Sequence, residues 1–273
     1  STRQESTAAQ PEWTINIALL ADKEFEDLEA RRLEPFGIER EDAWRLSQAT
    51  IMNLVSGIFE AIEPCIWGNF KLTMNIFAQE VIDLGSERDA IKLLLNELQK
   101  VSAKFEIGPS PQNVHLIHLM SGRDLVQQGS VTYGMAFPIT YEQGTGGVAK
   151  KFNQSVSQHI KEGDYQALLY QRMILVAHEL AHSLGVSEPL VPSHNSTKFK
   201  DEKEMSEQIP GYTGCGGEIN RVVGEIKPGQ PRLSTIMHDK FIGDGQPFLL
   251  KEEDLAIRKL LVYRLDNHFK FKG

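Results

Sequence analysis

The sequence predicts an α/β protein built on a twisted, mostly parallel β-sheet. Three observations support this prediction: a β-rich stretch at 14–20, helical spacing of apolar residues over 41–63, and apolar alternation at 70–77. Strands that alternate with helices are typical of layered sheets, because each helix carries the chain back across the sheet. We therefore expect most neighbouring strands to run in parallel.

The next elements along the chain extend the same pattern. Helical spacing returns over 86–105, and a further strand follows at 114–120. The stretch 129–140 (GSVTYGMAFPIT) is apolar and interrupted by glycine and proline, and proline in such a run indicates an edge strand. An exposed edge strand can pair with an extended peptide.

Composition and charge argue against several classes of function. The chain has 273 residues, of which 41% are hydrophobic and 24% charged, as in ordinary soluble globular proteins. Its 29 Lys and Arg against 37 Asp and Glu give a net charge of −8, which repels nucleic acids and anionic membrane surfaces. The apolar runs are shorter than the roughly 18 to 20 residues of a membrane span. We expect neither nucleic-acid binding nor membrane insertion.

The strongest chemical signal lies in a predicted buried helix over 165–184. His178, Glu179 and His182 form the pattern HExxH. Two histidines four residues apart point to one side of a helix, so both imidazoles can reach one tetrahedral Zn²⁺. Glu179 then lies beside the open coordination position, where it can serve as general base and pass a proton to the leaving amine. Gly185 follows at the point where the helix must end, because glycine accepts a left-handed cap.

The pattern HExxHxxG resembles the zinc-binding sequence of the metzincins, which continues to a third histidine or an aspartate. Residues 234–238 (STIMH) are similar to the family's Met-turn, in which Met237 would pack beneath the metal, and 248–257 is similar to its closing helix. The ends of the first strand and of the strand at 114–120 are similar to those of adamalysin (reprolysin) domains.

This resemblance implies a metzincin-like catalytic domain with an antiparallel edge strand. Gly134, Met135 and Ala136 occupy the place of the family's substrate-binding edge strand. The implied organisation is an upper subdomain over 14–184 and a smaller, irregular lower subdomain over 185–273. Residues 1–13 are polar and predict a flexible N-terminal arm.

The third zinc ligand has two candidates. Glu188 stands three residues after Gly185, where the family has histidine or aspartate, and a carboxylate is an ordinary zinc ligand. Alternatively, 187–192 form an inserted loop, and His194 corresponds to the family's third histidine. We favour His194 and keep Glu188 as the alternative.

The sequence thus predicts a zinc-dependent metalloendopeptidase that hydrolyses extended protein or peptide substrates. The alternatives are a catalytically silent metzincin-like scaffold that binds a protein partner through its edge strand, and a zinc hydrolase of a non-peptide amide. The family resemblance implies secretion, and we expect a monomer. The chain begins at Ser1 without an apolar leader, so we expect a processed mature form. Cys65 and Cys215 form one disulfide or none.

Overall fold

The computed structural model of the protein describes residues 12–60, 71–108, 110–137, 140–143, 149–159 and 165–183. These ranges contain the predicted sheet and most of the predicted HExxH helix. Several predicted features lie outside the described residues: Cys65, Glu188, His194, Cys215, Met237 and the helix at 248–257.

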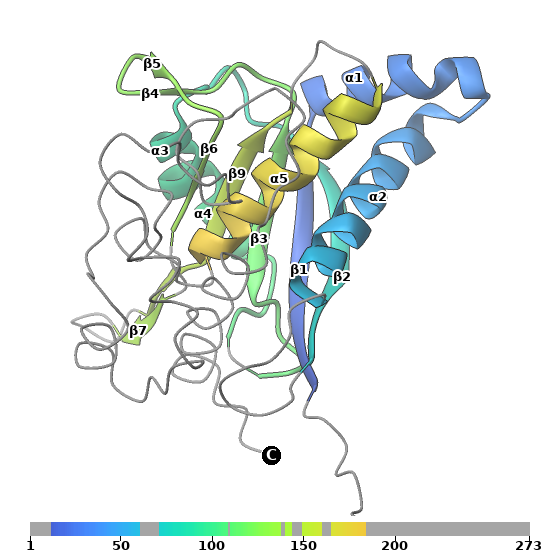
Figure 1. Ribbon diagram of the computed structural model, residues 1–273. Helices are drawn as coiled ribbons and strands as arrows, with labels where there is room; N and C mark the ends of the chain where they lie inside the picture. Colours follow the sequence, from blue (N-terminus) through green and yellow to red (C-terminus); the bar gives the residue numbers. More distant parts are fainter. Residues whose placement is uncertain are drawn as a thin grey trace, which may run out of the picture.

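A five-stranded sheet forms the middle layer, in the order β2-β1-β3-β9-β6 (Figure 1). The strands are β1 (Glu12–Asp22), β2 (Lys71–Ile82), β3 (Leu116–Ser121), β6 (Gly134–Ala136) and β9 (Gln154–Gln158). The first four in the spatial order are mutually parallel, and β6 pairs with β9 in antiparallel orientation. The predicted mixed α/β fold with a mostly parallel sheet is confirmed, and β6 is its antiparallel edge.

Helices cover both faces of this sheet (Figure 1). One face carries α1 (Lys23–Leu33), the short 3₁₀ helix η1 (Glu34–Phe36), α2 (Arg40–Glu60) and α5 (Tyr165–Ser183). The other face carries α3 (Ala90–Lys92), the π-helical turn η2 (Leu93–Glu97) and α4 (Leu98–Ser102). None of the helices that the structure describes combines the length and the hydropathy of a membrane span.

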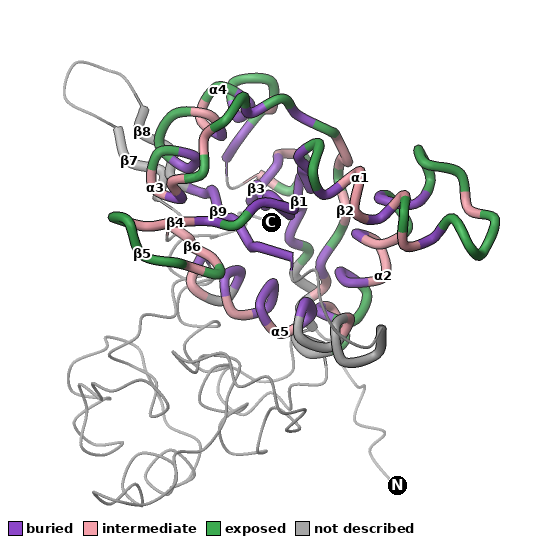
Figure 2. Tube along the Cα trace, turned by 90° about the horizontal axis from the view of Figure 1, so that it is seen from above, coloured by how far each residue is buried: buried purple, intermediate pink, exposed green. Residues whose placement is uncertain are grey.

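Among the strands that the structure describes, β1, β3 and β9 are the most deeply buried (Figure 2). Ala18, Leu20 and Val156 belong to an apolar cluster with Leu93 and Leu94, on the face covered by α3 and α4. Because successive side chains of a strand point to opposite faces, the residues between them point toward α1, α2 and α5. The sheet therefore separates two distinct cores.

Two small antiparallel sheets flank the main one. They pair β4 (Val126–Gln127) with β5 (Ser130–Val131) and β7 (Thr140–Gln143) with β8 (Ala149–Phe152). Gln128 and Gly129 connect β4 to β5 with φ values of 51° and 80°, the left-handed pair that a two-residue hairpin turn requires. The prediction of one edge strand over 129–140 is therefore wrong at its start, and the part of this strand that the structure describes is β6.

The predicted helix over 86–105 is also shorter than expected. It begins at Ala90, because the Asp89 side chain accepts a hydrogen bond from the backbone N–H of Lys92 at 3.1 Å and so caps the first turn. The helix then widens into the π-helical turn η2 before α4. This interrupted helix still explains the apolar spacing, because its buried residues face one side of the sheet.

The first two strands of the sheet exceed their predicted lengths. Strand β1 begins at Glu12, so the last two residues of the predicted flexible arm are extended. Strand β2 continues to Ile82, beyond the alternation at 70–77, and pairs with β1 throughout, with Gln79 opposite Leu19. Because β2 is an edge strand, polar residues are tolerated in its second half.

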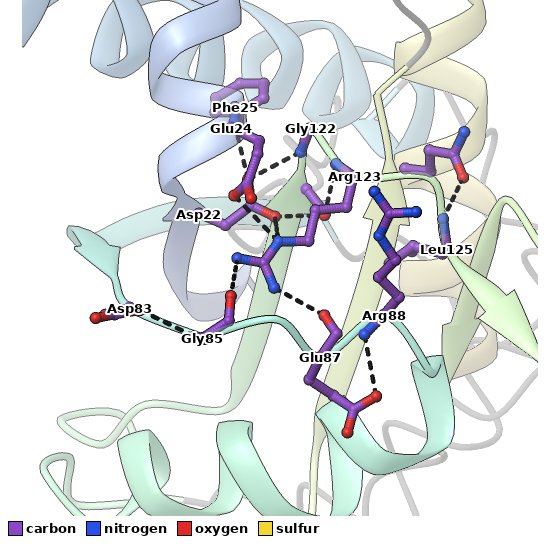
Figure 3. A network of polar contacts seen from close by, with 12 residues as sticks. Asp22, Glu24, Phe25, Asp83, Gly85, Glu87, Arg88, Gly122, Arg123 and Leu125 are labelled. Atoms are coloured by element: carbon purple, nitrogen blue, oxygen red, sulfur yellow. Dashed lines mark hydrogen bonds and ion pairs between the residues drawn. The ribbon is translucent and has the colours of Figure 1, made fainter.

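The end of β1 is fixed by Asp22, which is completely buried (Figure 3). Its carboxylate accepts hydrogen bonds from the backbone N–H of Phe25 at 2.8 Å, from that of Gly122 at 2.9 Å, and from the Ser121 hydroxyl. The first bond caps helix α1, and the other two join the end of β1 to the end of β3. Burial raises the pKa of Asp22, although these hydrogen bonds oppose that shift.

Arg123 extends this network from β3 to the loop after β2 (Figure 3). Its guanidinium donates to the carbonyl oxygens of Glu87 at 2.7 Å and Gly85 at 2.8 Å, and its Nε lies 3.0 Å from the Glu24 carboxylate. The same Nε lies 3.7 Å from Asp22. One buried side chain therefore links the carboxyl ends of three neighbouring strands.

Candidate active site

Helix α5 positions all three residues of the HExxH pattern against the sheet. The helix contacts β6, β9 and α2. Its buried apolar side chains anchor it there: Met173, Leu175, Val176, Ala177 and Leu180. His178 and His182 are half-buried, whereas Glu179 is only 4% exposed. The histidines thus remain accessible to a ligand while the carboxylate points into the protein.

The two histidines converge at their Nε2 atoms, which lie 3.0 Å apart. Their rings meet edge to face, with centroids 4.6 Å apart and an interplanar angle of 85°. Two nitrogen lone pairs at this distance repel each other unless a proton or a cation lies between them. Two imidazole ligands of one tetrahedral Zn²⁺ have nitrogens about 3.3 Å apart, given Zn–N bonds of about 2.0–2.1 Å. The observed separation suits an N–H···N hydrogen bond, and it is also close to that of two imidazole ligands on one zinc ion.

A complete metal site requires at least one further protein ligand. Within the residues that the structure describes, no group of three or more His, Cys, Asp or Glu side chains is arranged to hold a metal ion. The predicted third ligands, Glu188 and His194, both follow the described part of α5 in the sequence. The structure therefore brings together His178 and His182 and does not test the third position.

The carboxylate of Glu179 lies directly on the edge strand. A Cβ atom added to Gly134 would be 2.3 Å from Glu179 Oε1 and 2.7 Å from its Cδ. The absence of a side chain at Gly134 is what leaves this space to the carboxylate. The predicted general base and the predicted substrate-binding strand are thus in van der Waals contact.

The pairing of β6 with β9 shows which backbone groups face outward. Tyr133 accepts a hydrogen bond from Gln158 N–H at 2.7 Å, and Phe137 N–H donates to Gln154 at 3.0 Å. In an antiparallel pair the bonded positions alternate, so the N–H and C=O groups of Gly134 and Ala136 point away from β9.

The side chains of β6 alternate in the same way. Met135 packs against the apolar cluster on the α3 side of the sheet, and Gly134 meets Glu179 of α5 on the other. The Thr132 hydroxyl donates to the Gly134 carbonyl at 3.1 Å and helps to fix the start of the strand. Strand β6 is therefore held firmly on its inner side while its outer backbone groups face the edge.

A buried polar layer lies between α5 and the sheet. His118 of β3 is fully buried, with Nδ1 2.6 Å from the Ser155 hydroxyl and Nε2 2.8 Å from the Ser157 hydroxyl. Burial lowers the pKa of His118 to about 3, so the ring is neutral. Burial also lowers the pKa of His159, which stacks edge to face on Phe25. Both histidines are internal.

No family model matches the sequence, and no curated protein matches it. Among solved structures, the chain is similar to a zinc-dependent peptidase from Methanocorpusculum labreanum (strain Z), with 18% identity and a TM-score of 0.35. That match covers 63% of this chain and 82% of the other. The chain is also similar to a protein in a chaperone-substrate complex, with 13% identity and a TM-score of 0.39, over 92% of this chain and 35% of the other. Both likenesses are remote, and neither assigns an activity to this chain.

Two features of the site were not visible in the sequence. Gly134 and Glu179 are in contact although they are 45 residues apart in the sequence, and no helical or strand periodicity predicts a contact over that separation. The polar layer had a faint signal, since His118 interrupts an apolar strand and Ser155 and Ser157 alternate along β9. Such alternation places both serines on one face of the strand, but it does not reveal their partner.

Proposed function

We propose that this chain is a zinc-dependent metalloendopeptidase of the metzincin type, acting on extended protein or peptide substrates. The observation that carries the proposal is the convergence of His178 Nε2 and His182 Nε2 on the helix that also carries Glu179, whose carboxylate lies on the edge strand. A pair of nitrogen ligands, a buried carboxylate and a peptide-pairing edge are the parts that metal-assisted peptide hydrolysis requires.

In this proposal His178 and His182 hold Zn²⁺, with His194 as the third ligand and Glu188 as the alternative. Zinc, when bound, polarises the substrate carbonyl and makes a water molecule more acidic. Met237 lies in the proposed Met-turn, in a lower subdomain over 185–273 that completes the cleft with the upper subdomain over 14–184. Secretion, which the family resemblance implies, and a monomeric state are also proposals.

Glu179 supplies the proton transfers. Its carboxylate oxygens take a proton from the attacking water and deliver it to the leaving nitrogen. Its place on α5, next to His178 in sequence, puts the proposed proton acceptor on the same helix as the two proposed metal ligands.

The backbone of β6 binds the substrate. The outward N–H and C=O groups of Gly134 and Ala136 have the spacing that an added strand uses for hydrogen bonds. A peptide that pairs with this edge passes the carboxylate of Glu179, which lies against Gly134. Binding through backbone groups favours extended chains over folded ones and leaves the side-chain preference to other parts of the cleft.

The test is to measure zinc content and cleavage of a denatured protein substrate, with and without a chelator, for the wild type and two variants. Glu179→Gln removes the base but no ligand, so we expect retained zinc and a loss of cleavage by about 100-fold or more. Glu39→Gln, at an exposed glutamate remote in sequence from the site, is the matched control and should behave as the wild type. Bound zinc without cleavage by the wild type would instead support the silent scaffold that binds a protein partner.

A further inference from the structure

Gly134 begins β6, and glycine is an unusual residue in a β-strand. Glycine weakens a strand, and within a strand it often marks a close approach of another group. The described glycines with a left-handed backbone are Gly37, Gly85 and Gly129, and Gly134 is not among them. Any amino acid could therefore adopt the extended backbone of Gly134. Glycine is needed at this position because it has no side chain, and not because of its backbone conformation.

The three atoms nearest to a Cβ added at this position all belong to Glu179. They are Oε1 at 2.3 Å, Cδ at 2.7 Å and Cγ at 2.8 Å from the Cβ position. Gly122 offers a contrast, because a Cβ there would lie 2.4 Å from the backbone carbon of Glu24. A methyl group at Gly122 would force two backbone segments apart, whereas a methyl group at Gly134 would displace one flexible side chain.

We propose that Gly134 is a positioning residue that sets the place of the Glu179 carboxylate. This inference rests on the proposed function and adds a residue to it. Gly134 presents its outward N–H and C=O groups to a paired peptide and its bare Cα to the carboxylate. The same residue therefore aligns the peptide and the proton acceptor, and the bond to be cleaved lies beside Gly134.

The experiment compares Gly134→Ala with the wild type and with Gly57→Ala. Gly57 lies in α2, and a Cβ there meets nothing within 4 Å, so this control adds the same methyl group without a contact. For Gly134→Ala we expect unchanged zinc content, a KM close to the wild-type value, and a kcat lower by about 10- to 100-fold, since a displacement of about 1 Å has that effect. An unchanged kcat in an active, zinc-loaded protein would overturn the inference.

A double-mutant cycle separates this role from a general defect in the fold. In a Glu179→Ala background the base is gone, so Gly134→Ala should not lower the residual single-turnover rate any further. A second loss of similar size would show that the methyl group acts on the fold or on peptide binding, and would overturn the inference. If Gly134→Ala unfolds, the test is the melting temperature of the double variant with Glu179→Ala, because removing the carboxylate removes the clash. A melting temperature that returns toward the wild-type value supports the inference, and one that stays low overturns it.

Failure of the inference can be told apart from failure of the proposed function. A wild type that binds no zinc or cleaves no peptide contradicts the proposed function, and the inference falls with it. A wild type with chelator-sensitive cleavage, combined with a fully active Gly134→Ala, contradicts the inference alone.

Discussion

Arg172 of α5 donates a hydrogen bond from Nη1 to the Glu29 carboxylate of α1 across 2.7 Å, and the two side chains are 2% and 1% exposed. The Ser47 hydroxyl of α2 donates to the other oxygen of Glu29 at 2.6 Å. This buried group joins three helices on one face of the sheet. It fixes the helix that carries His178 and His182 at a point about two turns before the first and about three turns before the second.

We expect Arg172→Met to lower the free energy of unfolding by about 3 kcal/mol, because it leaves the Glu29 carboxylate buried without its closest cation. The double variant Arg172→Met with Glu29→Leu should recover at least half of this loss, since an apolar pair can replace a buried ion pair. Urea denaturation of the two variants measures both values. A double variant as unstable as Arg172→Met would show that the loss comes from packing.

The matched control for this ion pair is Arg45→Met. Arg45 lies 3.6 Å from Glu41, with side chains 50% and 80% exposed. Solvent screens such a pair, so the variant should change the free energy of unfolding by less than about 1 kcal/mol. A loss as large as that of Arg172→Met would mean that the method does not separate buried from exposed pairs.

The buried histidines predict a loss of stability in acid. The folded-state pKa of His118 is about 3, below its ordinary value of 6.5, because burial disfavours the charged ring. Its contribution to stability is therefore complete above pH 6.5 and is lost as the pH falls toward 3. The expected slope is about 1.4 kcal/mol per pH unit below pH 6 for this histidine. Urea denaturation at a series of pH values from 7.5 to 4.5 measures it.

Comparing the pH dependence of stability of the wild type with that of His118→Gln shows whether the slope comes from His118. Glutamine does not titrate, so the stability difference between the wild type and the variant should shrink as the pH falls below 6. Other groups, such as Asp22, whose pKa is raised by burial, contribute to both proteins and cancel in the difference. A difference that stays constant from pH 7.5 to 4.5 would contradict the neutral, buried state of His118.

The network around Asp22 predicts unequal effects for two helix caps. Asp22→Ala removes the cap of α1 and also the acceptor for Gly122 N–H, which is buried (Figure 3). We expect a loss of about 2–4 kcal/mol in the free energy of unfolding. Asp89→Ala removes only the cap of α3, which is partly exposed, and should lose about 1 kcal/mol. Equal losses in thermal and urea denaturation would show that the links between strand ends add nothing.

Periodicity predicted those elements of the fold whose burial is one-sided and regular. The helical spacing over 41–63 became α2, and the apolar run at 114–120 became β3. It failed where a local side chain or turn decided the outcome, as at Asp89, which starts the helix late, and at Gln128 and Gly129, which reverse the chain. These events depend on backbone dihedrals that an apolar pattern does not encode.

The site was predicted only as far as it lies on one helix. Spacing alone placed His178 and His182 on one side of α5, because residues four apart are neighbours on a helix. The contact of Glu179 with Gly134 depends on how α5 packs against β6, and sequence separation carries no information on that packing. The two candidates for the third ligand, Glu188 and His194, follow the HExxH pattern in the sequence, where helical spacing does not select between them.

Zinc should stabilise the folded protein through both histidines. At a free zinc concentration of about 100 times the Kd, binding adds about 2.7 kcal/mol to the free energy of unfolding, which corresponds to a rise of several degrees in Tm. His178→Ala and His182→Ala should each lose this rise, whereas Glu179→Gln should keep it. Thermal denaturation with and without zinc measures the effect. A rise that survives in both histidine variants would place the metal elsewhere in the chain.

The last prediction concerns the third ligand, for which His194 and Glu188 compete. The spacing after Gly185 favours Glu188, and the resemblance of 193–195 to the family's ligand favours His194. We expect His194→Ala to weaken zinc binding by at least 10-fold and to abolish cleavage, and Glu188→Ala to leave both close to wild type. Competition with a chromogenic chelator measures the affinity. The reverse result would assign the bond to Glu188, and it would also predict a site with one less positive charge, because a carboxylate neutralises part of the charge of Zn²⁺ whereas an imidazole does not.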